Sequence, residues 1–172
     1  LAYCGLLKEL YHALQEPEEI LSLRHEISLD FLRYTVDYKK DADILIRTLK
    51  QAGYTLVIAT TTNRSNMKVY RTENLKIKSK ADIDQYFTLI YTREDARQIK
   101  PHPEIYLRVL KELEVAPEEC LVFEDSLSGI EAAASAGIQT VAVYDSYSDA
   151  DRARICELST YQINHYAELL RP

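Results

Sequence analysis

Apolar residues in the first part of the chain recur at the spacing of a helix. In the first predicted helix they lie mostly three or four residues apart, at Leu6, Leu7, Leu10, Tyr11 and Leu14. Pro17, followed by two glutamates, is typical of the first turn of a second helix. The side of this second helix that we expect to be buried consists of Ile20, Leu21, Leu23, Ile27, Phe31 and Leu32. The pattern therefore predicts a helical segment over residues 1–38.

From Asp41 onward, helices alternate with short apolar runs. A helix is expected from Asp41 to Gly53, and others over residues 103–115, over 128–136 and after the last long apolar run. In the helix over 103–115, the residues expected to be buried are Ile105, Leu107, Leu110 and Leu113. The runs at 55–59, 87–91, 120–123 and 140–144 are candidate strands, and residues 161–166 form a last short segment. This alternation predicts right-handed βαβ crossovers and an α/β fold with a doubly wound, parallel, Rossmann-like sheet over residues 39–172.

Composition narrows the class of protein. Of the 172 residues, 47% are hydrophobic, which is enough to bury a core at this length. The net charge of −6 argues against a general binder of nucleic acid or of anionic membranes, because a lattice of phosphates would repel it. No apolar run reaches the roughly 20 residues of a membrane span. Cys4, Cys120 and Cys156 lack metal-ligand or redox spacing and suit buried thiols in a reducing compartment, so we expect a cytoplasmic protein, with a monomer as the default.

Ligands bind beyond the carboxyl ends of the strands in such a sheet, so the residues after each apolar run are the candidates for function. Thr60, Thr61, Thr62 and Asn63 directly follow the run at 55–59. Their short donors, together with the free N–H groups of the next helix, would form a cradle for phosphate. The alternative is a threonine-rich turn that only caps this helix. The segment alone does not decide between the two.

Two further strand ends carry charge. Lys100 lies on a loop stiffened by prolines, where an ammonium suits the neutralisation of a phosphoryl group in transfer, although a lone lysine before a helix is usually solvated. Glu124 and Asp125 directly follow the run at 120–123, and such adjacent carboxylates suit Mg²⁺. Without a cation, their repulsion should raise the pKa of one of them. The alternative is that Asp125 caps the next helix and Glu124 points to water.

The histidines and the remaining basic residues give no clear indication of function. The four histidines have no nucleophile motif near them, and the chain has no Gly-rich dinucleotide fingerprint. The basic residues that we expect simply to be solvated are Lys39, Lys40, Arg152 and Arg154.

Taken together, these strand ends resemble the haloacid dehalogenase-like hydrolase superfamily, in its phosphatase and phosphomutase branch with a helical cap. Residues 100–106 look like the third motif of that family, residues 123–133 like its fourth, and residues 56–60 like its second. The order and spacing of the three motifs also match, from about Asp41 to Asp145. Residues 1–38 look like the later part of the cap.

The resemblance implies a role for each candidate. Thr60 would bind the transferring phosphoryl group, and the segment from Thr61 to Asn63 would line the pocket for the substrate. Lys100 would bridge the phosphate and the nucleophile. Asp125 would bind Mg²⁺ directly, and Glu124 would bind it directly or through water. The protein would then be a Mg²⁺-dependent hydrolase that removes phosphate from a small phosphorylated metabolite through an aspartyl-phosphate intermediate.

One departure from the family is the missing first motif, a buried strand that ends in Asp-x-Asp and supplies the nucleophile. The strings that begin at Asp41, Asp82 and Asp149 do not follow apolar strands, and they are better explained as helix starts or exposed turns. We therefore expect the chain to be a fragment that lacks this central strand and the early cap. A sugar-phosphate mutase of the β-phosphoglucomutase type shares every motif present, and a non-catalytic binding module that has lost its nucleophile is a third alternative.

Overall fold

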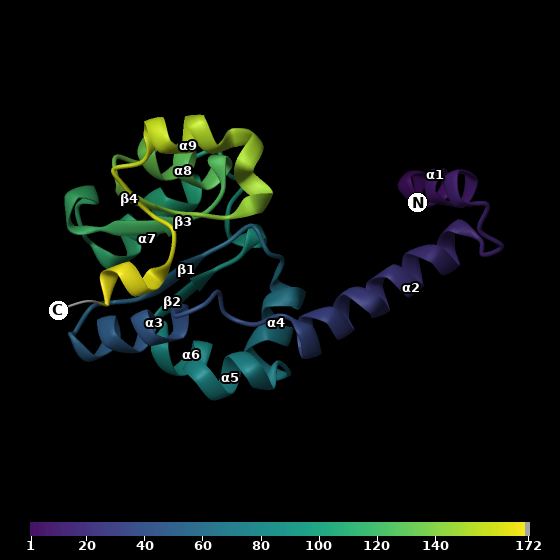
Figure 1. The fold of residues 1–172 in the computed structure, drawn as a ribbon, viewed down its shortest axis with the longest axis horizontal. Coiled ribbons are helices and arrows are strands. Elements are labelled where there is room, and N and C mark those ends of the chain that lie inside the picture. The colour runs from purple at the N-terminus through teal and green to yellow at the C-terminus, as the bar shows by residue number, and fades with distance from the viewer. Residues whose placement is uncertain (171–172) are drawn as a thin grey trace.

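A helical arm extends away from an α/β body, and the N-terminus lies at the far end of the arm (Figure 1). The structure is a computed structural model, and it describes residues 1–170. The arm consists of α1 (Ala2–Tyr11), α2 (Pro17–Asp30) and a π-helical turn, η1 (Phe31–Thr35). Helix α2 begins at Pro17, which lies in its first turn, and Glu16 and Glu19 form a capping box at this end. The two predicted N-terminal helices are confirmed.

The predicted buried side of the second helix is wrong. No residue of α2 is buried, and Leu21, Leu23 and Ile27 are all exposed. Of the six expected residues, only Leu32 in η1 is buried. The reason is that α2 packs mainly against α1 and η1, so no further layer covers its apolar face in the part of the chain that the structure describes.

The body contains short parallel strands that overlap the four predicted runs and the last predicted segment. They are β1 (Val57–Ala59), β2 (Leu89–Tyr91), β3 (Leu121–Glu124), β4 (Gln139–Val143) and β5 (Tyr161–Ile163). The helices of the body are α3 (Ala42–Gln51), α4 (Arg64–Thr72), α5 (Leu75–Ala81), α6 (Ile83–Tyr86), α7 (Glu104–Leu113), α8 (Leu127–Ser135) and α9 (Arg152–Leu158). Short 3₁₀ turns are η2 (Arg93–Asp95), η3 (Pro117–Glu119), η4 (Ser146–Asp151) and η5 (Tyr166–Leu169).

The strands form two parallel sheets. Strand β1 pairs with β2, with Ile58 opposite Ile90, and β4 lies between β3 and β5, with Val141 opposite both Phe123 and Tyr161. The predicted α/β class with parallel strands is confirmed. Within residues 1–170, β1 and β3 each pair with a neighbouring strand on one side only. One sheet therefore ends at β1 and the other ends at β3.

Helix α7 joins the two sheets through one core. Its buried residues, with those of α8, pack against partly buried side chains of β1, β2 and β3. The prediction that Leu107 is buried is wrong, since 47% of this residue is exposed. Tyr106 and Val109 are buried in addition to Ile105 and Leu110, because these four positions share one face of the helix.

A fully buried asparagine fixes the end of the arm to the body. The side-chain NH₂ of Asn74 donates to the carbonyl oxygens of Leu32, at 2.6 Å, and Val36, at 2.9 Å. Its Oδ1 accepts from the N–H of Ile77 at 2.9 Å and so caps α5. One side chain therefore satisfies backbone groups of both the arm and the body.

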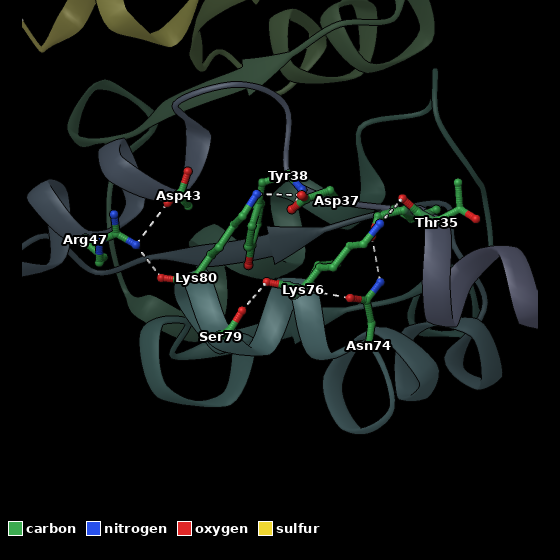
Figure 2. Close-up of polar contacts among 11 residues, drawn as sticks. Thr35, Asp37, Tyr38, Asp43, Arg47, Asn74, Lys76, Ser79 and Lys80 are labelled. Atoms are coloured by element: carbon green, nitrogen blue, oxygen red, sulfur yellow. Dashed lines mark hydrogen bonds and ion pairs between the residues drawn. The ribbon is translucent and has the colours of Figure 1, made fainter.

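The segment that follows the arm also lies on α5. Figure 2 shows Lys80 reaching Asp37, at 2.5 Å, beside Tyr38. The hydroxyl of Tyr38 donates to the carbonyl oxygen of Ala81 at 2.7 Å. These contacts fix residues 37 and 38 against α5. The next residue, Lys39, reaches the strand ends described below.

No helix in the described part of the chain is both long enough and apolar enough to cross a membrane. All three cysteines are free thiols. Cys4 is buried, as expected, whereas Cys120 and Cys156 are only partly buried.

Candidate active site

An ion pair connects the carboxyl ends of the two sheets. Lys100 comes from the loop after β2, and Glu124 is the last residue of β3. The Lys100 Nζ lies 2.5 Å from the Glu124 Oε1, and the two side chains are only 6% and 12% exposed. The lysine and the acid that the sequence suggested are thus brought together at one edge of the body.

The carboxylate of Glu124 has further donors around it. Its Oε2 accepts from the N–H of Asp125 at 2.9 Å, and from the N–H and the hydroxyl of Ser126 at 3.3 and 3.1 Å. Burial opposes ionisation of Glu124, but Lys100 and these donors outweigh it and hold its pKa below the ordinary value. The expectation that one of the adjacent carboxylates titrates high is therefore wrong for Glu124, because the compensating cation comes from another strand end.

Glycine is required where α8 approaches this carboxylate. A Cβ on Gly129 would lie 1.9 Å from the Glu124 Oε1 and 2.0 Å from its Cδ. No real Cβ contact is that short, so Gly129 and the observed position of Glu124 depend on each other.

The loop that carries Lys100 is held by Glu104 at the start of α7. The two carboxylate oxygens of Glu104 accept from the N–H groups of Arg97 and Gln98, both at 2.9 Å. These backbone hydrogen bonds lower the pKa of Glu104. Behind the loop, the ring of Tyr106 lies 4.8 Å from the Lys100 Nζ.

Asp125 turns the other way, toward Lys39. The Lys39 Nζ lies 2.7 Å from the Asp125 Oδ2, and it also forms an ion pair with Asp145, which follows β4. Partial burial lowers the pKa of Lys39, but the two carboxylates outweigh this and raise it. Side chains at successive positions of a strand point to opposite sides, which explains why Glu124 and Asp125 diverge. The expectation that Lys39 is simply solvated is wrong.

Asp125 and Asp145 are the carboxylates of the site that could bind a divalent cation. The ammonium of Lys39 between Asp125 and Asp145 shows that the position already attracts positive charge. No group of three or more metal-binding side chains occurs within residues 1–170. Mg²⁺ needs fewer, because it commonly binds one or two protein carboxylates and completes its octahedron with waters and substrate phosphate oxygens.

Thr60 lies at the carboxyl end of β1. Its N–H donates to the carbonyl oxygen of Tyr91 at 2.9 Å, which continues the pairing of β1 with β2. Its Oγ1 accepts from the N–H of Thr62 at 3.0 Å and donates to the hydroxyl of Thr62. The Thr60 hydroxyl is thus held in a compact turn and is only partly buried.

The end of this threonine segment is a helix cap. The Oδ1 of Asn63 accepts from the N–H of Asn66 at 2.7 Å, at the start of α4. Thr61 is exposed. Of the two alternatives left open for the segment, capping applies to Asn63, while the hydroxyls of Thr60 and Thr62 lie at the strand end.

The three Asp-x-Asp strings lie at helix starts, as expected. Asp41 precedes α3, Asp82 caps α6 by accepting from the N–H of Asp84 at 3.0 Å, and Asp151 precedes α9. None of the strings directly follows a strand.

Sequence reasoning missed several residues that touch the candidate site, among them Lys39, Asp145 and Tyr106. Asp145 follows β4 closely, so the rule on strand ends would have selected it. Nothing in the sequence connects Lys39 with Asp125, because the path of the backbone over α5 brings them together.

A parallel α/β body with a lysine, carboxylates and a threonine at or after the carboxyl ends of its strands has the architecture that the resemblance implied. A family model described as haloacid dehalogenase-like hydrolase matches residues 3–143. The chain therefore belongs to the haloacid dehalogenase-like hydrolase family.

Curated relatives with more specific names match this chain over only part of their own length. A phosphorylated carbohydrates phosphatase of Thermotoga maritima is 46% identical over 69 residues, which are 40% of this chain and 32% of the relative. In eight of the curated relatives that it matches, the chain spans between 26% and 55% of the relative's length.

Solved structures align with nearly the whole chain. A protein of Thermotoga maritima, assigned provisionally as a β-phosphoglucomutase, has a TM-score of 0.76 and 28% identity, over 93% of this chain and 71% of that one. A mutant of CbbY from Rhodobacter sphaeroides, in complex with xylulose 1,5-bisphosphate, has a TM-score of 0.72 and 25% identity, over 91% of this chain and 67% of that one.

Proposed function

We propose that the full-length protein is a phosphatase that releases phosphate from a small phosphorylated metabolite, with phosphorylated sugars as the substrate class. The observation that carries the proposal is the buried Lys100–Glu124 pair, with Asp125 next to Glu124 in the chain and Thr60 directly after β1. A lysine fixed in this way stabilises negative charge on a phosphoryl group without reorganising during the reaction. The named relatives that act on phosphorylated carbohydrates or hold a sugar bisphosphate support the substrate class.

In this proposal Lys100 and Thr60 contact different parts of the phosphoryl group. Lys100 neutralises its oxygens, and Thr60 donates a hydrogen bond from its hydroxyl. Thr61 and Thr62 line the pocket, and Asn63 supports it as the cap of α4. The partial exposure of Thr60 and Thr62 supports an approach from the strand ends.

Mg²⁺ is the cofactor that we propose, with Asp125 as its direct ligand. The ion would supply positive charge that stabilises the phosphate oxygens. Glu124 would act at longer range, because Lys100 and backbone donors already occupy its carboxylate. This arrangement predicts that Asp125→Asn loses more Mg²⁺ affinity than Glu124→Gln when each full-length variant is titrated calorimetrically. Equal losses, or a larger loss at Glu124, would contradict the assignment.

We propose that the nucleophile is an aspartate on a strand that fits between β1 and β3. The unpaired sides of these strands support this proposal, since buried backbone groups require partners. The aspartate oxygen would attack phosphorus while the bond from phosphorus to the metabolite oxygen breaks, and that oxygen would take a proton. Water would then hydrolyse the aspartyl phosphate and release inorganic phosphate.

Residues 1–38 would form part of a cap over the strand ends, and the α/β core would start at residue 39. The many exposed apolar side chains of α1 and α2 support this, because large apolar surfaces on a folded protein commonly mark a contact site. We further propose a cytoplasmic location, supported by three free thiols.

The alternative is a sugar-phosphate mutase, which the likeness to the Thermotoga maritima protein favours. A panel of phosphorylated sugars and nucleotides, assayed with the full-length protein and Mg²⁺, separates the possibilities. Release of inorganic phosphate from sugar phosphates is the expected result. Interconversion of glucose 1-phosphate and glucose 6-phosphate without net release would favour the mutase. Neither activity on any substrate would favour a non-catalytic binding module.

A further inference from the structure

We propose that Glu104 is a positioning residue for Lys100, because its carboxylate closes the loop that carries the lysine and so sets where the ammonium lies. This inference rests on the proposed function, since the position of Lys100 matters for a reaction only if the lysine contacts a transferring phosphoryl group. Glu104 is assigned to act through the loop and not by touching the substrate.

The carboxylate of Glu104 joins the two ends of a short loop. Its Oε1 accepts from the N–H of Arg97 and its Oε2 accepts from the N–H of Gln98, both at 2.9 Å. Arg97 and Gln98 lie where the chain enters the loop, and Glu104 lies where the chain leaves it, as the first residue of α7. We call these two hydrogen bonds the Glu104 bridge. Because each carboxylate oxygen has its own backbone donor, the bridge fixes both the distance and the orientation of the two loop ends.

Hydrogen bonds inside the closed loop restrict the backbone at Lys100. The N–H of His102 donates to the carbonyl oxygen of Ile99 at 2.9 Å, so a tight turn encloses Lys100. The N–H of Glu104 donates to the Nδ1 of His102 at 3.2 Å. The turn that contains Lys100 is thus attached to the residue that closes the loop.

The contacts of the Lys100 side chain hold its tip and leave its backbone to be placed by the loop. The Nζ meets the Glu124 Oε1 at 2.5 Å and lies 4.8 Å from the ring of Tyr106. A lysine side chain has many rotamers, so after a shift of the loop the ammonium would reach Glu124 from another direction. A small misplacement of a group that binds the transition state lowers kcat more than it weakens substrate binding.

The charge of Glu104 suits this role. The N–H groups of Arg97 and Gln98 lower the pKa of Glu104, and they outweigh burial, which opposes ionisation. Hydrogen bonds from backbone N–H groups to an ionised carboxylate are stronger than those to a neutral acceptor. A glutamine at this position offers one acceptor oxygen in place of two, so Glu104→Gln should weaken the bridge and Glu104→Ala should remove it.

Glu119 provides a matched control. Its Oε2 accepts from the N–H of Ala116 at 2.8 Å, so a glutamate carboxylate also closes a short backbone turn here, at η3. Glu119 precedes β3, whereas Glu124 is the last residue of that strand, so the two lie at opposite ends of β3. The Glu119→Ala substitution therefore removes a contact of the same kind without touching the loop that carries Lys100.

The kinetic experiment compares four full-length proteins with p-nitrophenyl phosphate: the wild type, Glu104→Ala, Glu104→Gln and Glu119→Ala. We expect Glu104→Ala to lower kcat by about tenfold, with KM within about twofold, because the ammonium is misplaced and not lost. Glu104→Gln should have an intermediate kcat, and Glu119→Ala should retain that of the wild type. A wild-type kcat in Glu104→Ala, or an equal loss in Glu119→Ala, would overturn the proposal. Circular dichroism identifies variants that do not fold, and if Glu104→Ala is one of them, a wild-type kcat in Glu104→Gln would overturn it.

A double-mutant cycle separates positioning from a general structural role. In a Lys100→Ala background there is no ammonium to misplace, so Glu104→Ala should lower kcat further by less than about twofold. A general effect on the fold would instead lower kcat by the same factor in both backgrounds. Equal factors would therefore refute a role that acts through Lys100.

Hydrogen exchange of backbone amides tests the Glu104 bridge without activity. The N–H groups of Arg97 and Gln98 should exchange about tenfold faster in Glu104→Ala than in the wild type, and at the wild-type rate in Glu119→Ala. Unchanged exchange in Glu104→Ala would show that the bridge does not hold the loop. A wild type that releases no phosphate would instead refute the proposed function, so the two failures are distinguishable.

Discussion

Removal of the Lys100 charge should destabilise the fold strongly at neutral pH. The substitution Lys100→Met keeps the length of the side chain and its packing beside Tyr106, but it leaves Glu124 without its cation. Removal of one partner from a buried ion pair typically costs about 3–5 kcal/mol. Glu124 retains three donors from Asp125 and Ser126, so we expect a value near the lower end, about 3 kcal/mol. For a chain of this size, this corresponds to a fall in Tm of roughly 6–12 °C.

The loss should depend on pH in a defined direction. In the wild type the pKa of Glu124 is lowered, so its contribution to stability is present above the ordinary pKa of 4.5 and is lost as the pH falls through the folded value. In Lys100→Met, burial without a cation should raise this pKa. The variant should then lose stability as the pH rises above about 4.5 and should approach the wild type in acid.

Urea unfolding at pH 5 and pH 8, followed by circular dichroism, measures both effects. The double variant Lys100→Met with Glu124→Gln is the control, because a neutral pair in place of a buried ion pair is often tolerated. It should recover most of the stability and lose the dependence on pH. A cost below about 1 kcal/mol for Lys100→Met, with no change between the two pH values, would refute the conclusion that the pair is buried.

Two further predictions concern the surroundings of the two carboxylates. Gly129→Ala should cost about 1–3 kcal/mol, because its Cβ would overlap Glu124, but it should cost almost nothing in a Glu124→Ala background; an equal cost in both backgrounds, measured by urea unfolding, would contradict the steric argument. Lys39→Met should raise the affinity of the full-length protein for Mg²⁺ by about fivefold, because a competing cation near Asp125 is removed. Calorimetric titration of Mg²⁺ measures this change, and an unchanged or weaker affinity would count against a metal site at Asp125.

The sequence was sufficient for those parts of the fold that depend on local pattern. The positions of the strands and the helix starts at the three Asp-x-Asp strings follow from periodicity and from the preference of aspartate for the start of a helix, although only Asp82 caps its helix through its side chain. The exposure of α2 could not be predicted, because burial depends on what packs against a helix and not on its own sequence. The same limit applies to Leu107, where the inward face of α7 is set by the two sheets beneath it.

The candidate site was predictable only in part. Strand ends identified Thr60 and Glu124, since each directly follows a recognisable apolar run, and the proline-flanked loop before a helix identified Lys100. The partners of these residues were not predictable, because contacts such as Lys39 with Asp125 depend on the tertiary path of the chain. The low pKa of Glu124 was missed for the same reason, since it requires Lys100 from another strand end.

We propose that Lys100, held by Glu124, stabilises a phosphoryl group in transfer. The most direct measurement is the kcat for phosphate release from p-nitrophenyl phosphate by the full-length Lys100→Ala variant, below its unfolding temperature. A Lys78→Ala variant is the control, since Lys78 is an exposed lysine on α5. We expect a loss of about 100-fold or more for Lys100→Ala and wild-type kcat for Lys78→Ala. An unchanged kcat in Lys100→Ala would contradict a role for Lys100 in phosphoryl transfer.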